Sequence, residues 1–104
     1  MRCAPEQAPV FNSLAWLLAT CPDEEHRDGS QAVQHAIRAC ELTEWTNPHC
    51  LGTLAAAYAE MGEFPKAVRW QAEAIEAATA DYDVAAAQRR LGLYKAARPY
   101  RQEP

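Results

Sequence analysis

Apolar residues recur along this chain at intervals of three or four positions, in five segments separated by polar residues, glycine or proline. This spacing is typical of an α-helix that buries one side. The third segment is the clearest, because Leu51, Leu54, Ala55 and Tyr58 follow at i, i+3, i+4 and i+7. In the first segment Phe11, Leu14, Ala15 and Leu18 are expected to form the buried side. We predict helices over residues 9–20, 28–42, 48–61, 65–78 and 82–98.

Local signals mark several of the predicted helix ends. Asn47 followed by Pro48 indicates a helix start, because the Asn side chain accepts backbone N–H groups and proline lacks one. Asp28 opens the pattern of a capping box, and Asp81 is placed to cap the last helix. Gly62 is expected to end the third helix in the left-handed conformation.

The composition favours a single all-α domain. Alanine, the best helix former, is abundant, whereas β-branched residues are few. A chain of 104 residues is long enough for one domain with a modest core. We therefore expect one domain over residues 1–104, with residues 1–8 and 99–104 as flexible termini.

The second and fourth predicted helices repeat each other with a shift of 35 residues, which places Ala32 on Ala67 and Ala39 on Ala74. The period of a tetratricopeptide repeat is close to this, at about 34 residues. Between residues 48 and 79, large, small, aromatic and turn residues follow in that family's order: Leu51, Leu54, Ala55, Ala57, Tyr58, Gly62, Glu63, Phe64, Ala67, Ala74 and Ile75. This segment resembles a tetratricopeptide repeat.

The resemblance implies a right-handed superhelix of two helical hairpins and a C-terminal capping helix. Residues 48–80 would form the second repeat and residues 82–98 the capping helix. Residues 9–42 would form a degenerate first repeat, since its turn is longer than usual and lacks the glycine–acid–aromatic sequence. The chain is similar to degenerate tetratricopeptide modules that end long bacterial multidomain proteins.

The charge argues against nucleic acid as a partner, because the net charge is −4 and a nucleic-acid binder needs a basic face. Residues 84–102 nevertheless hold five basic residues and no acid. We interpret them as a solvated helix with cations near its C-terminal end, the alternative being a strip that binds phosphate or acidic groups. No apolar run has the roughly 18–20 residues that cross a bilayer. The first residues lack the apolar run of a signal peptide, so a cytoplasmic protein without a membrane partner is expected.

Residue patterns for catalysis or metal binding are missing from the sequence. The four cysteines form no Cys-x-x-Cys pair, and no histidine pairs with another ligand at i+3 or i+4 in a metal-like motif. No Gly-rich phosphate loop, Gly-x-Ser-x-Gly or His-Glu-x-x-His motif occurs. We therefore expect neither an enzyme nor a cofactor or metal site.

The resemblance instead implies a scaffolding module that binds a peptide or protein partner in a groove lined by the first helix of each hairpin. The groove residues would be Asn12, Trp16, Thr20, His49, Gly52, Ala56 and Glu60. The alternatives are a purely structural unit that caps a longer solenoid, or a homodimer module without a ligand of its own.

The first predicted helix is apolar almost all round, so it needs cover on more than one side. Phe11, Trp16 and Leu17 are candidate self-association residues. Three explanations stay open: the loop over residues 22–28 folds back, an upstream repeat covers the helix, or the chain associates with a second copy.

Overall fold

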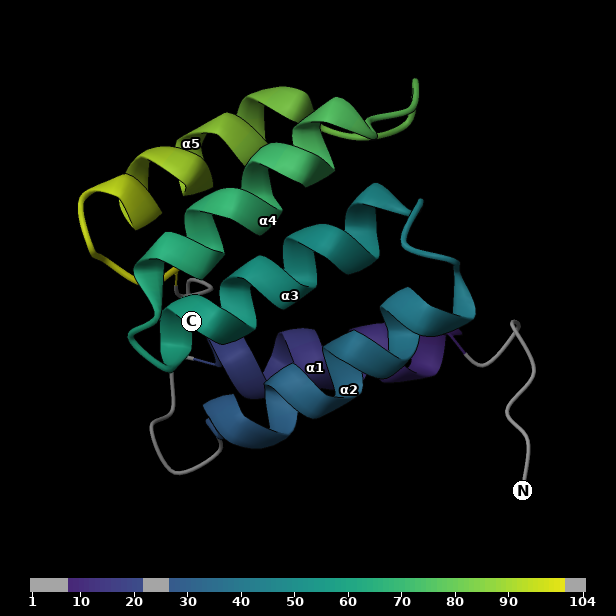
Figure 1. Cartoon of the computed structure of the whole chain (residues 1–104), viewed down its shortest axis with the longest axis horizontal. Coiled ribbons are helices and arrows are strands. Elements are labelled where there is room, and N and C mark those ends of the chain that lie inside the picture. The colour runs from purple at the N-terminus through teal and green to yellow at the C-terminus, as the bar shows by residue number, and fades with distance from the viewer. Residues whose placement is uncertain (1–7, 22–26, 101–104) are drawn as a thin grey trace.

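The computed structural model describes residues 8–21 and 27–100, which form five α-helices and no strand (Figure 1). The helices are α1 (Ala8–Thr20), α2 (Gly29–Leu42), α3 (Pro48–Glu60), α4 (Phe64–Glu76) and α5 (Val84–Lys95). The all-α prediction is confirmed, and each predicted helix is present. None of the five, of which the longest has 14 residues, has the length and apolar character needed to cross a membrane.

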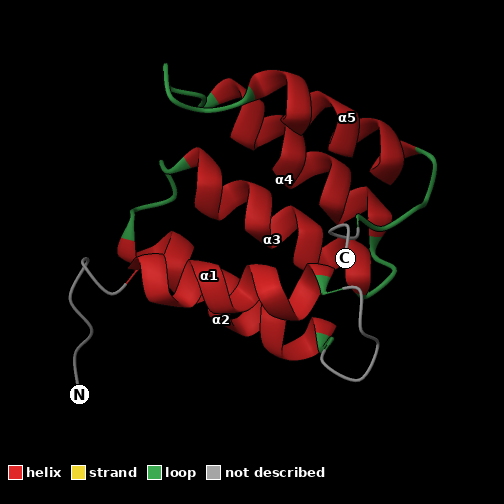
Figure 2. Cartoon of the chain, turned by 180° about the vertical axis from the view of Figure 1, so that it is seen from behind, coloured by secondary structure: helices red, strands yellow, loops and turns green. Residues whose placement is uncertain are grey.

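Consecutive helices pack side by side and turn back on one another. α1 pairs with α2, α3 pairs with α4, and α5 lies along α4 (Figure 1). α3 also packs against both α1 and α2, so it is the central helix of the array. Seen from behind, α1 lies in front of α2 (Figure 2).

The caps of α3 follow from its sequence. Asn47 Oδ1 accepts the backbone N–H of His49 at 2.9 Å and that of Cys50 at 3.4 Å. At the other end, Gly62 adopts φ +80°, and the N–H of Glu63 donates to Tyr58 O at 2.9 Å. This is the glycine-dependent helix stop expected at Gly62.

The start of α5 differs from the prediction. Asp83, and not Asp81, caps the helix, because Asp83 Oδ1 accepts the N–H of Ala86 at 3.0 Å. The Asp81 carboxylate instead accepts a hydrogen bond from the Thr79 hydroxyl, within a turn closed by Tyr82 N donating to Thr79 O at 3.0 Å. That turn places Tyr82 before the helix.

α4 and α5 are shorter than predicted, ending at Glu76 and Lys95. Beyond α5, Ala97 takes a left-handed φ of +58°, which stops the helix before Pro99. Of the termini expected to be flexible, Ala8 is buried as the first residue of α1, and Tyr100 packs on the core, while residues 1–7 and 101–104 lie outside the described residues.

The core is built on buried alanines, as the repeat pattern predicts. Ala67 and Ala74 of α4 are fully buried, and Leu54 of α3 is buried beside them in the interior. Tyr58 is half-buried and packs against the cluster that contains Ala67. Small side chains allow the helix backbones to approach closely while larger ones fill the remaining space.

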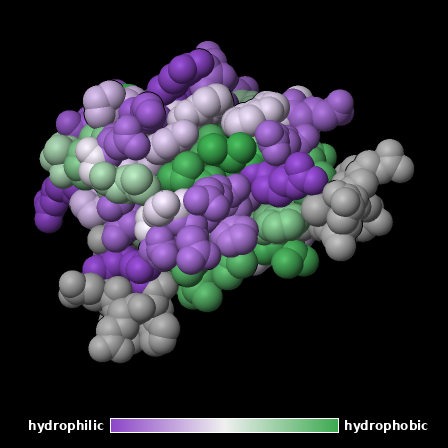
Figure 3. Space-filling model, turned by 60° about the horizontal axis from the view of Figure 1, so that its bottom comes forward, coloured by the Kyte–Doolittle hydropathy of each residue, from purple (hydrophilic) through white to green (hydrophobic). Residues whose placement is uncertain are grey.

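The buried side predicted for α1 is right for Ala15, Phe11 and Leu18, which are buried or packed against the core, and wrong for Leu14. Leu14 is 40% exposed, together with Val10 at 66% and Leu17 at 50%, whereas Ala15 and Ala19 are fully buried. These three side chains point outward because α1 meets its neighbours on the side that carries Ala15 and Ala19, where Phe11 and Leu18 also pack. Figure 3, which views the α1–α2 side, shows apolar residues at the surface among polar ones.

Candidate functional site

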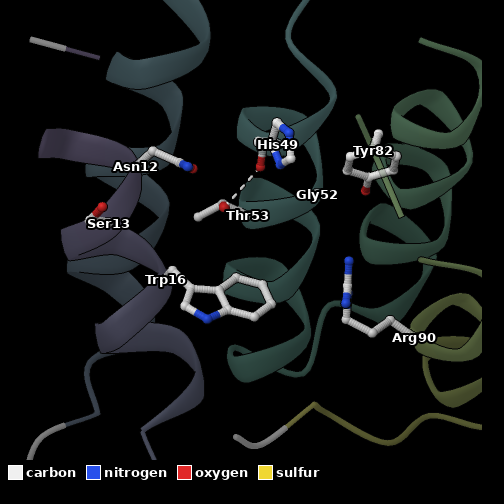
Figure 4. Close-up of a pocket in the computed structure, with 8 residues that line it drawn as sticks. All are labelled: Asn12, Ser13, Trp16, His49, Gly52, Thr53, Tyr82 and Arg90. Atoms are coloured by element: carbon white, nitrogen blue, oxygen red, sulfur yellow. Dashed lines mark hydrogen bonds between the residues drawn. The ribbon is translucent and has the colours of Figure 1, made fainter. Parts of the chain in front are cut away.

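A cavity of about 310 Å³ lies between α1, α3 and α5. Its walls come from residues more than seventy positions apart in the chain, as Figure 4 shows. The lining residues are Asn12, Ser13, Trp16, His49, Gly52, Thr53, Tyr82 and Arg90.

Helical spacing brings the α1 and α3 residues to the same cavity. Asn12 and Trp16 are four positions apart on α1, so both side chains lie on one side of that helix. His49 and Gly52 are three apart on α3 and face them. The Thr53 hydroxyl is turned inward to its own helix, donating to His49 O at 2.9 Å.

Gly52 forms a side-chain-free floor under two buried polar groups. A Cβ atom on Gly52 would lie 3.1 Å from the Tyr82 hydroxyl and 3.7 Å from Gln71 Oε1. Tyr82 is 8% exposed and Gln71 is fully buried. Gln71 Nε2 donates to Ala87 O at 2.9 Å, which holds the side chain between α4 and α5.

Several polar atoms at this cavity have no hydrogen-bond partner among the described residues. They are Asn12 Oδ1, Gln71 Oε1, Tyr82 Oη and Arg90 Nε. Buried polar atoms in folded proteins are normally hydrogen-bonded, and each exception needs an explanation. Asn12, Tyr82 and Arg90 line the cavity, whereas Gln71 lies beneath its floor at Gly52. Three such atoms in the lining of one cavity indicate a place where a ligand supplies the missing partners.

Arg90 brings a cation to the cavity and is held by aromatic rings. Its guanidinium carbon lies 5.4 Å from the centre of the Trp16 ring and 5.6 Å from that of Tyr100. Cation–π contacts of this kind fix the side chain without neutralising its charge. In Figure 4 the Arg90 guanidinium points into the space between Trp16 and Tyr82.

His49 and Asp81 form the outer rim. His49 Nε2 lies 3.9 Å from Asp81 Oδ2, and the His49 ring meets the Tyr82 ring edge-on at 5.0 Å. The hydrogen bond from Thr79 lowers the pKa of the Asp81 carboxyl, with a smaller contribution from His49. A carboxylate thus lies next to the His49 side of the cavity.

No family model, curated protein or solved structure matches this chain. The relation to tetratricopeptide repeats accordingly stays a hypothesis that rests on the residues of this sequence.

The structure brings only part of the predicted groove together. Asn12, Trp16, His49 and Gly52 line the cavity. Thr20 and Ala56 do not, because both side chains are buried. Thr20 donates its hydroxyl hydrogen to Trp16 O at 2.7 Å, and Ala56 belongs to the cluster against which Trp16 packs.

Glu60, the last predicted groove residue, lies in an ion pair at the end of α3. Its Oε2 atom is 3.4 Å from Arg27 Nε, and both side chains are largely covered. Gly29 passes close to this corner, where an added Cβ would come within 3.1 Å of Glu60 Cγ. Glu60 thus ties the start of α2 to the end of α3.

Tyr82 and Arg90 are cavity residues that the sequence prediction missed. Arg90 belongs to the basic segment 84–102, so the sequence showed that a cation was present there. The sequence did not show that the Arg90 side chain points toward α1. Tyr82 was placed inside a predicted helix, and only the turn at residues 79–82 aims it at Gly52.

The cysteines and acids do not form a metal centre in the part of the chain that the structure describes. Within residues 8–21 and 27–100, no three His, Cys, Asp or Glu side chains are grouped to hold a metal ion. Cys40 and Cys50 are buried and unbonded to each other. Burial, with a smaller contribution from Cys50, raises the pKa of the Cys40 thiol to about 12. A thiol in this state is a poor nucleophile.

Proposed function

We propose that this protein is a binding module, with no catalytic role, that holds a peptide segment of a partner protein in the cavity between α1, α3 and α5. The observation that carries the proposal is the set of polar atoms without partners at the cavity, together with the Arg90 cation beside them. A tetratricopeptide-like array of hairpins is the arrangement that fits the sequence repeat and the five helices.

A peptide suits this cavity because every residue of a peptide offers both a donor and an acceptor. Arg90 Nε can donate to a carbonyl or carboxylate, whereas Asn12 Oδ1 can accept an N–H group. Trp16 supplies an apolar wall for a side chain. The combination of an aromatic wall with a few aimed polar groups is typical of ligand sites.

The test is a selection of random peptides on the immobilised full chain, followed by backbone NMR titration of a selected peptide. Binding should shift the amide resonances of Asn12, His49, Gly52 and Thr53. Arg90→Gln should weaken binding at least tenfold, whereas Arg69→Gln, which removes the same charge from an exposed position on α4 away from the cavity, should change it less than threefold.

Shifts confined to another face, or equal loss in both arginine variants, would reject the cavity as the site. Failure to select any peptide would favour the alternative of a structural unit that closes a helical array.

A second candidate, self-association, is favoured by the exposed apolar stripe on α1. Val10, Leu14 and Leu17 lie at i, i+4 and i+7 and are all exposed. The other two candidates do not belong to this stripe, since Phe11 stacks on His35 at 5.9 Å and Trp16 contacts Tyr100. Sedimentation equilibrium should show a dimer that Leu17→Glu dissociates and that Gln34→Glu, on the exposed side of α2, leaves intact. A wild-type monomer at all concentrations removes this candidate.

A further inference from the structure

The chain after α5 is turned back toward the first helix. Ala97 N donates to Tyr94 O at 3.0 Å, and Arg98 N donates to Leu93 O at 2.9 Å. With the left-handed φ of +58° at Ala97, this is the helix stop in which the chain reverses direction. The residues that follow, Pro99 and Tyr100, are therefore directed across the array and not away from it.

Tyr100 lies at the edge of the cavity where Trp16 and Arg90 meet. Its ring centre lies 5.6 Å from that of Trp16, and the Arg90 guanidinium carbon lies 5.6 Å from the Tyr100 ring centre. Tyr100 also packs against the cluster formed by Ala55, Ala59, Ala67 and Tyr94. A single residue after the last helix thus contacts α1 through Trp16 and α5 through Arg90, and packs against a cluster drawn from α3, α4 and α5.

Two cavities meet at this point. The first is the candidate site described above, and the second, of about 350 Å³, is lined by Ala86, Arg89, Arg90, Leu93 and Tyr100. Arg90 borders both cavities, and Tyr100 stands beside it. Moving Tyr100 away would expose the side of Trp16 that its ring now covers. The two cavities would then form one longer groove along α5.

The contacts of Tyr100 are of a kind that another chain can reproduce. They consist of a tilted ring pair, a cation over the ring face, and packing on small apolar residues. Each of these recognises an aromatic side chain whatever chain it belongs to. The Tyr100 ring is only half-buried, so it can leave this position without opening the core.

We propose that residues 97–100 are a built-in cover for the α5 end of the groove, and that Tyr100 holds the place taken by an aromatic side chain of the partner peptide. The inference rests on the proposed function and adds the kind of residue recognised. Because Tyr100 is part of the same chain, it competes with a peptide for the contact with Trp16 and Arg90 at an effective concentration on the order of millimolar. Weakly binding peptides and peptides without an aromatic residue are therefore excluded.

The experiment uses the full chain with Tyr100→Ala and, as probe, a synthetic peptide of residues 96–104 in two forms, with Tyr or with Ala at position 100. Binding is followed through the indole N–H resonance of Trp16. The Tyr peptide should bind the Tyr100→Ala chain at least tenfold more tightly than the wild-type chain, and should move the Trp16 resonance back toward its wild-type position. The Ala peptide should do neither.

Circular dichroism establishes that the variant is folded, and Tyr100→Leu, which keeps an apolar side chain without the aromatic ring, serves as a second opened chain. The proposal is overturned if the Tyr peptide binds the wild-type and opened chains equally, or binds none of them. It is also overturned if a peptide selected on the wild-type chain occupies the cavity while the ring resonances of Tyr100 stay at their wild-type positions. That last outcome would leave the peptide-binding function intact, so the two proposals can fail separately.

Discussion

Gly52 lies directly under the Tyr82 hydroxyl, and a Cβ atom at position 52 would come within 3.1 Å of it. A residue in the middle of α3 is therefore small because of a residue in the turn before α5. The relationship explains why a glycine is kept in a helix interior, where it destabilises the helix by roughly 0.5–1 kcal/mol relative to alanine.

Replacing Gly52 should change the affinity for a peptide without much change in the stability of the fold. Gly52→Ala should leave the free energy of unfolding within about 1 kcal/mol of wild type, because the gain in helix propensity offsets the displacement of Tyr82. The added methyl group occupies the cavity floor, so affinity for a selected peptide should fall at least tenfold. Urea unfolding and peptide titration measure the two effects.

The control for that variant is Gly92→Ala on α5, where an added Cβ meets nothing within 4 Å. It should stabilise the fold by about 0.5–1 kcal/mol and leave the affinity unchanged. Equal affinity of the Gly52→Ala and Gly92→Ala chains would contradict a ligand at the cavity floor.

Gln71 is the second buried group at this floor, and its role can be tested by a change of similar volume. Gln71→Met removes one hydrogen bond to Ala87 O but also the unpartnered Oε1, so stability should change by less than about 1.5 kcal/mol. Gln71→Ala leaves a void and should cost about 2–3 kcal/mol. Thermal unfolding of both variants checks this order, and the reverse order would show that the amide is needed for folding.

Close packing of α3 and α4 predicts intolerance at the smallest buried positions. Ala67→Leu should destabilise the fold by about 2–3 kcal/mol, because the added atoms have no space in a fully buried contact. The matched change on the exposed side of the same helix, Ala72→Leu, should stay within about 0.5 kcal/mol. A melting temperature unchanged by Ala67→Leu would refute the helix pairing.

The left-handed helix stops after α3 and α5 predict opposite signs for two simple exchanges. Gly62→Ala should destabilise the fold by about 1 kcal/mol, because an alanine is strained at φ +80°. Ala97→Gly should stabilise it by about 0.5–1 kcal/mol, because it relieves the strain at φ +58°. Guanidinium unfolding gives both values, and the same sign for both would be inconsistent with these turns.

Alkaline pH should weaken the fold through its buried acids. Burial raises the pKa of Cys40 from 9.0 to about 12, and also raises the pKa of Cys50 and of Tyr94. Below pH 9 the Cys40 thiol is protonated in both the folded and the unfolded chain, so it adds no pH dependence. Between pH 9 and about 12 only the unfolded chain releases this proton, and stability falls by up to about 1.4 kcal/mol per pH unit for this group.

The variant Cys40→Ala tests whether the Cys40 thiol causes this loss of stability with rising pH. Denaturation curves recorded at pH 8, 10 and 11 should show a shallower decline for the variant than for wild type. Parallel declines would assign the effect to other groups, Tyr94 first among them.

The sequence alone was enough to predict the five helices and most of their ends. Asn47, Asp28 and Gly62 act through neighbours a few residues away, so their roles are readable from local order. The same holds for Ala67 and Ala74, whose burial follows from a helical period and from a repeat that places small residues at matching positions.

Tertiary structure decided which side of α1 is covered and where the site lies. Leu14 faces solvent although its spacing fits a buried stripe, because the contact of α1 with its neighbours is centred on Ala15 and Ala19. Tyr82, Arg90 and Tyr100 meet residues of α1 and α3 from the far end of the chain. Periodicity tells which residues share a side of one helix, but it carries no information on how five helices are placed against one another, and that placement creates the cavity and its cover.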